Sequence, residues 1–472
     1  MMKKFLIISV GPVPTSNESI VEGGGLRAWG IAKGLSSHGI EVTVAVPENF
    51  PLTPETTGEG IKVCNWSFTN LKELCGKNDS VYVLYSRGDL MKFIATEIDS
   101  KQPLIVDLYV PIYIESLARN TRKDFMGLTE HLNNVEHWNY AFPRGDYFLC
   151  PNNCQYHLYN GTLSAFGRIN PVTYEADLLN IVPFGVHQEN PVHTQNVCKG
   201  KIIGKDDFMI LWFGGIYPWF DINPLLDAVE KLSQKYSNIK LVILGGRNPF
   251  VGEPEFIDKY ESVVKYSQKR NTFDKSVFFV DWIPYDERSN WYLEADLLVN
   301  LHNVGTESIY AWRTRVVDFI WGELPMVTSG GDELSDSLAQ QGAAVILDDN
   351  SAEVIYANVE ALFKDQKKLK ILKENIIKAK EGLYWEKVTR DLAEFIKKDA
   401  IAPDRKMLIK NGISSQNLTP NIAPAVNSGP NRFMKSLSYG MYVLRQEGIK
   451  SFVSKLRVFI KKRISPDKNQ LS

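Results

Sequence analysis

Cysteine is scarce in this chain, and the few cysteines present are not grouped. The 472 residues include five of them, at positions 64, 75, 150, 154 and 198, with no CxxC pair. An odd and scattered set predicts neither a disulfide framework nor a zinc site. It favours a reducing compartment. We therefore expect a cytoplasmic protein without a structural metal.

Several sequence signatures are also missing. The chain has no P-loop, no GxSxG turn around a nucleophilic serine and no DxD motif, and its seven histidines do not cluster at metal-ligand spacing. No stretch approaches the roughly 20 apolar residues of a membrane span. The N-terminal sequence MMKKFLIISVGPVP superficially resembles a signal peptide. Its apolar run is only about six residues long before glycine and proline interrupt it, so we predict a first β-strand there.

The formal net charge of -1 hides a basic C-terminal segment. Residues 431–463 contain nine Lys or Arg and one Glu, which leaves a net charge of -9 on the rest of the chain. A stretch rich in Pro, Asn and Ser at 401–430 predicts a linker. The apolar spacing and basic polar face of 431–472 predict an amphipathic helical tail, suited to an anionic membrane surface. A solvated or domain-packing helix pair is the alternative. Stacking aromatics are too sparse to predict a nucleic-acid partner.

Strand and helix patterns alternate in two successive series. The first series predicts helices at 26–37 and 115–138 and strands at 4–10, 41–46, 81–85, 104–107 and 147–150. The second predicts strands at 208–213, 239–244, 277–280, 297–301, 326–328 and 343–347. Such alternation indicates an α/β protein with two doubly wound, Rossmann-like domains, residues 1–185 and 186–400. Ligands of such sheets bind at the carboxyl ends of the strands, so we expect a cleft between the domains.

Three positions in the first domain are candidates for this cleft. Gly24 and Gly25 belong to a glycine run that opens the first long helix, where the backbone can approach an anion closely. A plain flexible turn is the alternative. Asp107 ends a buried strand and should face the cleft, unless it caps the next helix; Tyr109 is a weaker candidate for the same surface. His187, in VPFGVH at the expected hinge, is a candidate for a catalytic or a structural role.

In the second domain, the sequence FGGIYPWFD follows the strand at 208–213. Gly214 and Gly215 leave room for a ligand, and Trp219 could stack on a base unless it belongs to the core. Arg247 follows the next strand and is either a phosphate ligand or a solvated side chain.

The stretch 307–331, ESIYAWRTRVVDFIWGELPMVTSGG, combines carboxylates, arginines and a glycine pair. Carboxylates accept hydrogen bonds from sugar diols, whereas guanidinium groups and backbone amides suit a diphosphate. Glu307 is placed for a sugar, and Asp318 is predicted to open a short helix and hold a ribose. Arg313 and Arg315 alternate, so one of them should face the cleft; an Arg313–Asp318 ion pair is the alternative.

A glycine pair ends this stretch. Gly330 and Gly331 follow a predicted strand and should leave the N-terminus of the next helix open toward a phosphate or a sugar.

Together these motifs resemble retaining glycosyltransferases of the GT-B fold, most closely family-4 transferases of bacterial polysaccharide assembly. The resemblance covers residues 1–398 and rests on GGGLRAW, VPFGVH, FGGIYPWFDINPLLDAV, DLLVNLH, the stretch 307–331 and YWEKVTRDLAEFI. It implies that the second domain holds a nucleoside-diphosphate sugar and the first an acceptor. In that fold the final helix crosses back onto the first domain.

By position, the resemblance assigns Glu307 to the sugar and Asp318 to the ribose. The chain departs from the family pattern because ten residues separate these two side chains, and Tyr310 stands where a glutamate is usual. The family's basic residues for the diphosphate are missing from GGIYPWFD. We hypothesise that Arg313, Arg315 or Arg247 replaces them.

The resemblance implies a retaining, metal-independent transfer that needs no cofactor beyond the sugar nucleotide as co-substrate. The acceptor would be a hydroxyl of a glycan or a lipid-linked molecule in cell-envelope polysaccharide assembly, and a peripheral position on the inner face of the cytoplasmic membrane would suit it. A nucleotide-sugar epimerase of the same fold and a non-catalytic glycan-binding scaffold remain the alternatives.

Overall fold

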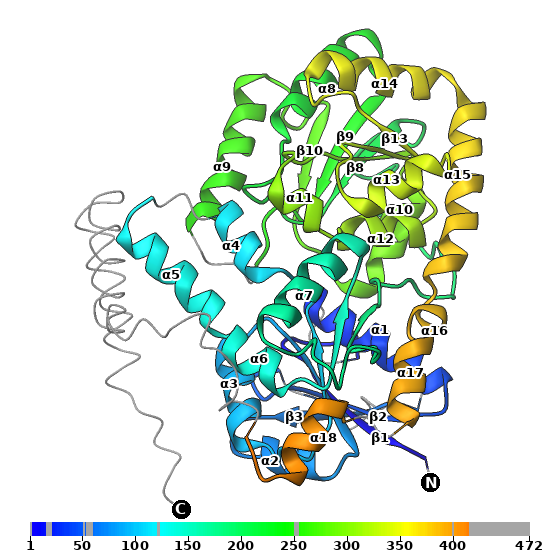
Figure 1. The fold of residues 1–472 in the computed structure, drawn as a ribbon. Helices are drawn as coiled ribbons and strands as arrows, with labels where there is room; N and C mark the ends of the chain where they lie inside the picture. Colours follow the sequence, from blue (N-terminus) through cyan, green and yellow to red (C-terminus); the bar gives the residue numbers. More distant parts are fainter. Residues whose placement is uncertain are drawn as a thin grey trace, which may run out of the picture. The chain divides into compact units, whose positions relative to one another are not determined.

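The computed structural model describes residues 2–15, 21–50, 52, 60–119, 123–249, 254–398 and 401–414. The tail predicted at 431–472 lies outside the described residues, as does most of the linker predicted at 401–430. Two parallel β-sheets lie within one compact unit (Figure 1). The predicted α/β class is confirmed.

The first sheet has seven strands in the order β3-β2-β1-β4-β5-β6-β7, and every neighbouring pair is parallel. Its strands are β1 (Lys4–Ile8), β2 (Glu41–Pro47), β3 (Lys62–Trp66), β4 (Ser80–Leu84), β5 (Leu104–Asp107), β6 (Tyr147–Cys150) and β7 (Leu179–Ile181). Every residue of β4, β5 and β6 is buried, as expected for strands covered on both faces. The two edge strands were not predicted from the sequence, because β3 is half-exposed and β7 has only three residues.

Seven helices belong to this half of the chain: α1 (Gly23–Ser37), α2 (Leu71–Gly76), α3 (Gly88–Glu97), α4 (Ile112–Arg119), α5 (Phe125–Glu136), α6 (Trp138–Arg144) and α7 (Asn153–Ala165). The single helix predicted at 115–138 is wrong, since α4, α5 and α6 divide that region. Asp124 provides one reason, because its Oδ1 accepts a hydrogen bond from the Gly127 amide at 2.9 Å and starts a new helix.

The second sheet has six parallel strands in the order β10-β9-β8-β11-β12-β13. They are β8 (Phe208–Phe213), β9 (Ile239–Leu244), β10 (Val277–Val280), β11 (Leu297–Asn300), β12 (Met326–Thr328) and β13 (Ala344–Ile346), close to the predicted ranges. The helices of this half are α8 (Asn223–Lys235), α9 (Pro254–Lys269), α10 (Arg288–Glu294), α11 (Thr306–Tyr310), α12 (Thr314–Trp321), α13 (Glu333–Gln340), α14 (Ala352–Lys364) and α15 (Gln366–Lys380).

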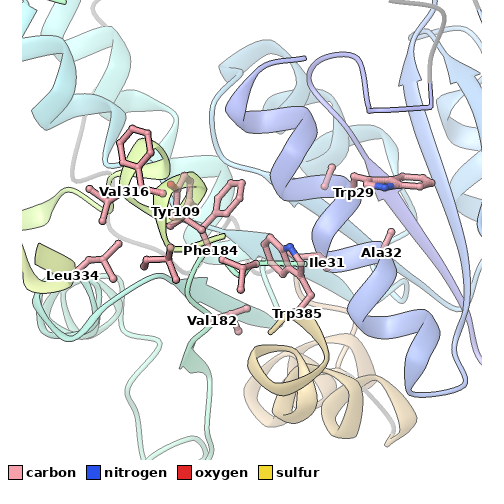
Figure 2. Close-up of a cluster of buried hydrophobic side chains, with 14 of the residues drawn as sticks. Trp29, Ile31, Ala32, Tyr109, Val182, Phe184, Val316, Leu334 and Trp385 are labelled. Carbon is pink, nitrogen blue, oxygen red and sulfur yellow. The ribbon is translucent and has the colours of Figure 1, made fainter. Parts of the chain in front are cut away.

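After α15 the chain returns to the first domain through α16 (Trp385–Val388) and α17 (Arg390–Lys397). Trp385 packs against α1 where Gly30 allows close approach, because a Cβ on Gly30 would lie 2.0 Å from the indole. Phe395 stacks on Tyr147 with ring centroids 3.9 Å apart. Figure 2 shows Trp385 beside Ile31 of α1, in a buried cluster that continues to α12.

One further helix, α18 (Pro403–Lys410), lies inside the predicted linker. Its Asp404 pairs with Arg168, with Oδ2 2.7 Å from Nε, and its Arg405 pairs with Asp146. These side chains are nearly excluded from water. The assignment of residues 403–410 to a linker is therefore wrong, because buried ion pairs attach this segment to the first domain.

The described residues contain no helix with both the length and the apolar character that a bilayer crossing requires.

Candidate functional site

A cavity of about 610 Å³ is lined by both domains at the carboxyl ends of their strands. The first domain contributes residues that follow β1, β4 and β5, and the second contributes residues that follow β8, β9 and β10. The volume lies in the range of small-molecule sites. Doubly wound sheets bind ligands at these strand ends, beside the point where the strand order reverses.

The first turn of α1 forms one wall of the cavity. Gly23 and Gly24 line it, whereas Gly25 does not. A Cβ on Gly25 would lie 1.8 Å from the carbonyl oxygen of Pro12, so this glycine serves the packing of the turn. The first amides of an α-helix have no acceptor within the helix, and the helix dipole places partial positive charge there. This wall therefore suits an anion.

Arg315 is a buried cation on the second-domain side. One terminal nitrogen donates to the carbonyl oxygen of Gly215 at 2.7 Å, and the guanidinium lies over the ring of Phe220 at 4.1 Å. The other terminal nitrogen is buried without a hydrogen-bond partner. Among the described residues no carboxylate forms an ion pair with this side chain, which is 8% exposed. Burial lowers the pKa of Arg315 to about 9, and the neighbouring charge of Arg313 adds to this shift.

The helix that carries Arg315 begins at the cavity. Helix α12 starts at Thr314, which lines the cavity together with Gly214 and Gly215. The prediction that Asp318 opens this helix is wrong: Asp318 lies on its second turn. The helix start thus directs the positive end of its dipole toward the same space as Arg315.

Arg313 forms an ion pair with Glu307 rather than with Asp318. Two hydrogen bonds of 3.1 and 2.7 Å join the guanidinium to the carboxylate, and both side chains line the cavity. The pair links α11 to the start of α12. Its charges largely neutralise each other, which leaves Arg315 as the uncompensated cation of this wall.

Asp318 faces the cavity beside Arg288, with its Oδ1 3.8 Å from Nε. The guanidinium of Arg288 also stacks on Tyr285, 3.4 Å from the ring centroid. Burial raises the pKa of Asp318 to about 6, although Arg288 opposes this shift. A carboxylate with this pKa is mostly ionised at pH 7 and can accept hydrogen bonds from a diol.

Aromatic side chains cover another part of the cavity. Trp219 lines it, together with Tyr217 and Trp282. The Tyr217 and Trp219 rings lie 5.1 Å apart, and Trp219 is only 8% exposed. Trp219 therefore belongs to both predicted settings, the core and the cavity wall.

Asp107 does not line the cavity. It is fully buried, and both of its oxygens accept hydrogen bonds from Arg27, at 2.6 and 3.2 Å. The hydroxyl of Tyr82 donates to the same carboxylate at 2.5 Å. The prediction of a catalytic role for Asp107 is therefore wrong, because its carboxylate forms a buried ion pair and does not reach the cavity.

His187 and Arg247 also lie outside the cavity lining. Burial lowers the pKa of His187 to about 4, helped by Lys33 and Arg288, so its imidazole is neutral at pH 7. Arg247 is exposed.

The glycine pair after β12 does not line the cavity either. Gly330 and Gly331 have φ values of 71° and 78°, the left-handed region that favours glycine. The N-terminus of α13 is not open as predicted, because Asp332 accepts a hydrogen bond from the Ser335 amide at 2.9 Å and caps it. The pair therefore makes a turn.

Several cavity residues were not predicted. Arg288, Tyr285 and Trp282 belong to the connection DWIPYDER after β10, and Glu22 and Glu115 line the first-domain side. The signal for the first three was available, since aromatic and basic residues follow the predicted parallel strand at 277–280. Glu115 lies on α4, which the wrong single-helix prediction concealed. No group of three or more metal-ligating side chains gathers in the part of the chain that the structure describes.

No family model matches the sequence, and no curated protein matches it. Solved structures match in fold. Sucrose-phosphate synthase from Thermosynechococcus elongatus aligns with a TM-score of 0.58 at 12% identity, over 84% of this chain and 98% of its own. HepE of Anabaena in complex with UDP-glucose aligns with a TM-score of 0.54 at 15% identity, over 84% and 99%. WaaG, a glycosyltransferase involved in lipopolysaccharide biosynthesis, aligns with a TM-score of 0.56 at 13% identity, over 84% and 99%.

At these identities the matches establish the fold alone. They extend over nearly the whole of each solved chain, so both sheets and their connection are shared. The two parallel sheets with their helices agree with these matches. The chain therefore has the GT-B fold.

Proposed function

We propose that this protein is a glycosyltransferase that uses a nucleoside-diphosphate sugar as its donor. The observation that carries the proposal is Arg315, a buried guanidinium that has no carboxylate partner among the described residues, and one of whose buried nitrogens finds no acceptor there. A diphosphate would supply the missing anion. The shared fold supports the proposal, since WaaG is a glycosyltransferase and HepE was solved with UDP-glucose.

The charges of the cavity suggest how the donor binds. The diphosphate would lie beside Arg315 and the first turns of α12 and α1, where partial positive charge meets the cavity. The ribose diol would lie beside Asp318, and the aromatic wall near Trp282 would take the base. The sugar would then lie on the side of Glu307.

The same groups would stabilise the leaving group. Negative charge grows on the diphosphate as the glycosidic bond breaks, and prearranged donors such as Arg315 and the helix amides stabilise such charge. We therefore propose a metal-independent transfer. Glu307 is held by Arg313 at 2.7 Å, which fits a charge-positioning carboxylate better than a free nucleophile. Retention would follow from same-face substitution, in which a departing phosphate oxygen helps to deprotonate the acceptor hydroxyl.

The acceptor is proposed to be a glycan or lipid-linked hydroxyl in cell-envelope polysaccharide assembly. The five free cysteines fit a cytoplasmic location. The basic segment 431–463 could attach the enzyme to an anionic membrane surface. Co-sedimentation with anionic liposomes tests that attachment, and equal binding by the full chain and a chain ending at Pro430 would disprove it.

A thermal-shift screen tests the donor proposal. Bound ligand stabilises the native state, so one of UDP, GDP, dTDP or ADP should raise Tm more than the matching nucleoside. No shift with any diphosphate would reject the proposal. Product analysis then distinguishes the alternatives: an epimerase releases a rearranged sugar without an acceptor, and a scaffold leaves the donor intact.

Donor affinity should depend on the ionisation of Asp318. Because its pKa is raised to about 6, the carboxylate is mostly ionised at pH 7 and mostly protonated at pH 5. We expect UDP affinity to fall about tenfold between these values as the charged acceptor is lost. In Asp318→Asn this pH dependence should flatten, with affinity low throughout. A wild-type affinity equal at pH 7 and pH 5 would contradict the ribose role.

Removing the carboxylate of Glu307 should slow transfer strongly. Glu307→Gln leaves Arg313 without its charged partner and removes a charge beside the sugar. We expect a fall in kcat of about a hundredfold, the size typical for loss of one electrostatic group in an active site. Glu353→Gln is the control, because it removes an exposed carboxylate paired with Lys231 in the same domain. Equal kcat values for wild type and Glu307→Gln would exclude the role of Glu307.

A further inference from the structure

The segment between α11 and α12 is held by the first domain. Three consecutive backbone carbonyls, those of Tyr310, Ala311 and Trp312, accept hydrogen bonds from its side chains. We call residues 310–312 the strap. Arg313 and the first turn of α12 follow directly, so the strap leads into the cation-bearing wall of the cavity.

Each strap carbonyl has its own donor. Gln155 donates to Tyr310 O at 2.7 Å, Asn152 donates to Ala311 O at 3.3 Å, and Tyr109 donates to Trp312 O at 2.9 Å. Gln155 and Asn152 are nearly fully buried. Buried hydrogen bonds of this kind hold a defined geometry, because breaking them strands polar groups away from water.

The three donors are themselves rigidly held. Asn152 caps α7 by accepting the Gln155 amide at 2.8 Å, and Gln155 donates a second hydrogen bond to Tyr109 O at 3.1 Å. The Tyr109 ring lies under the guanidinium of Arg27 at 4.6 Å and against Phe184 at 5.7 Å. Figure 2 shows Tyr109 close to Phe184 and to Val316 of α12.

A separate contact reinforces this arrangement. Glu333, the first residue of α13, accepts hydrogen bonds from the Asn153 amide at 2.9 Å and from the Asn153 side chain at 2.6 Å. A carboxylate of the second domain thus caps α7 of the first, where a helix N-terminus favours negative charge.

From this geometry we propose that Tyr109, Asn152 and Gln155 are positioning residues for nucleotide binding. By fixing the strap they set the direction of Arg313 and of the first turn of α12, although Asn152 and Gln155 do not line the cavity. The nucleotide face of the second domain therefore depends on contact with the first. The choice of a nucleotide as the ligand rests on the proposed function. The hydrogen bonds that hold the strap belong to the ligand-free protein and do not depend on it.

Gln155→Met tests the proposal, because methionine keeps the approximate volume and removes both donors. Gln102→Met is the matched control: Gln102 also donates to two carbonyls, those of Cys75 and Asn78, entirely within the first domain. Amide hydrogen exchange over residues 306–316 of the ligand-free protein should accelerate about tenfold in Gln155→Met and stay at the wild-type rate in Gln102→Met.

UDP affinity provides the functional measurement. We expect it to fall about fivefold to tenfold in Gln155→Met and to remain unchanged in Gln102→Met. Tyr109→Phe should weaken binding similarly, against Tyr159→Phe as its control, since the hydroxyl of Tyr159 donates to Leu108 O within the first domain.

Two results would overturn the proposal. Exchange over 306–316 that stays unchanged in both Gln155→Met and Tyr109→Phe would show that the strap is not held by these side chains. Faster exchange with unchanged UDP affinity would show that the strap does not position the nucleotide site. Failure of the wild-type protein to bind UDP, GDP, dTDP or ADP would reject the proposed function instead, and the exchange comparison would still decide whether the strap is held.

Discussion

Replacing Arg315 with methionine should weaken nucleotide binding strongly while leaving the fold at least as stable. The guanidinium is the uncompensated cation of the cavity, and a charge-assisted hydrogen bond to a phosphate contributes about 1.5–3 kcal/mol. We therefore expect UDP affinity to fall about tenfold to a hundredfold, measured by isothermal titration calorimetry.

The stability of the same variant should move in the opposite direction. Because burial lowers the pKa of Arg315 to about 9 in the folded protein, carrying its charge at pH 7 opposes folding. Arg315→Met should thus show an unchanged or higher Tm without ligand. Most destabilising substitutions would lower Tm and binding together, so the opposite signs are diagnostic.

Arg247→Met is the matched control for Arg315→Met. Arg247 follows the neighbouring strand β9 but is exposed and outside the cavity, so its removal should change neither affinity nor Tm. Wild-type UDP affinity in Arg315→Met would show that this arginine does not bind the diphosphate.

Replacing Arg27 with methionine should cause the largest loss of stability. Arg27 pairs with Asp107, both fully buried, and donates to the carbonyl oxygens of Val182 and Pro183 at 2.8 and 2.9 Å. Its loss leaves a buried carboxylate without its cation, which typically costs about 3–5 kcal/mol. That is a large part of the usual free energy of unfolding, about 5–15 kcal/mol.

Denaturant unfolding measures the loss of unfolding free energy in Arg27→Met, and two further variants serve as controls. Lys62→Met removes a cation from an exposed ion pair with Glu41 and should cost at most about 1 kcal/mol. In Arg27→Met combined with Asp107→Leu, the stranded charge is gone, so part of the stability should return. A loss in Arg27→Met no larger than in Lys62→Met would contradict the structural role of this pair.

The strands were predictable because a parallel strand covered on both faces is a nearly continuous apolar run. For this reason the first and last residues predicted for β5 and β6 are those of the observed strands. The edge strand β3 lacks such a run, and α18 was concealed by a composition typical of linkers. Its two buried ion pairs involve side chains more than 200 positions away, which local patterns do not reveal.

The candidate site was predictable in part. Its location followed from the strand ends, and Gly214, Gly215, Arg315 and Asp318 do line the cavity. The partners of the charges were not predictable. Asp107 and Asp318 both looked like cleft carboxylates, yet one is neutralised by Arg27 in the interior and the other lies beside Arg288 in the cavity.

The sequence by itself determined the α/β class, the two successive sheets and the edge at which a ligand would bind, because these depend on periodicity and strand order. Only the tertiary structure decided which charges are paired. Glu307 pairs with Arg313 and Asp107 pairs with Arg27, whereas Arg315 in the cavity has no carboxylate partner within the part of the chain that the structure describes. The reason is physical: pairing and burial depend on distances between residues far apart in the chain, and those distances exist only once the two domains have folded.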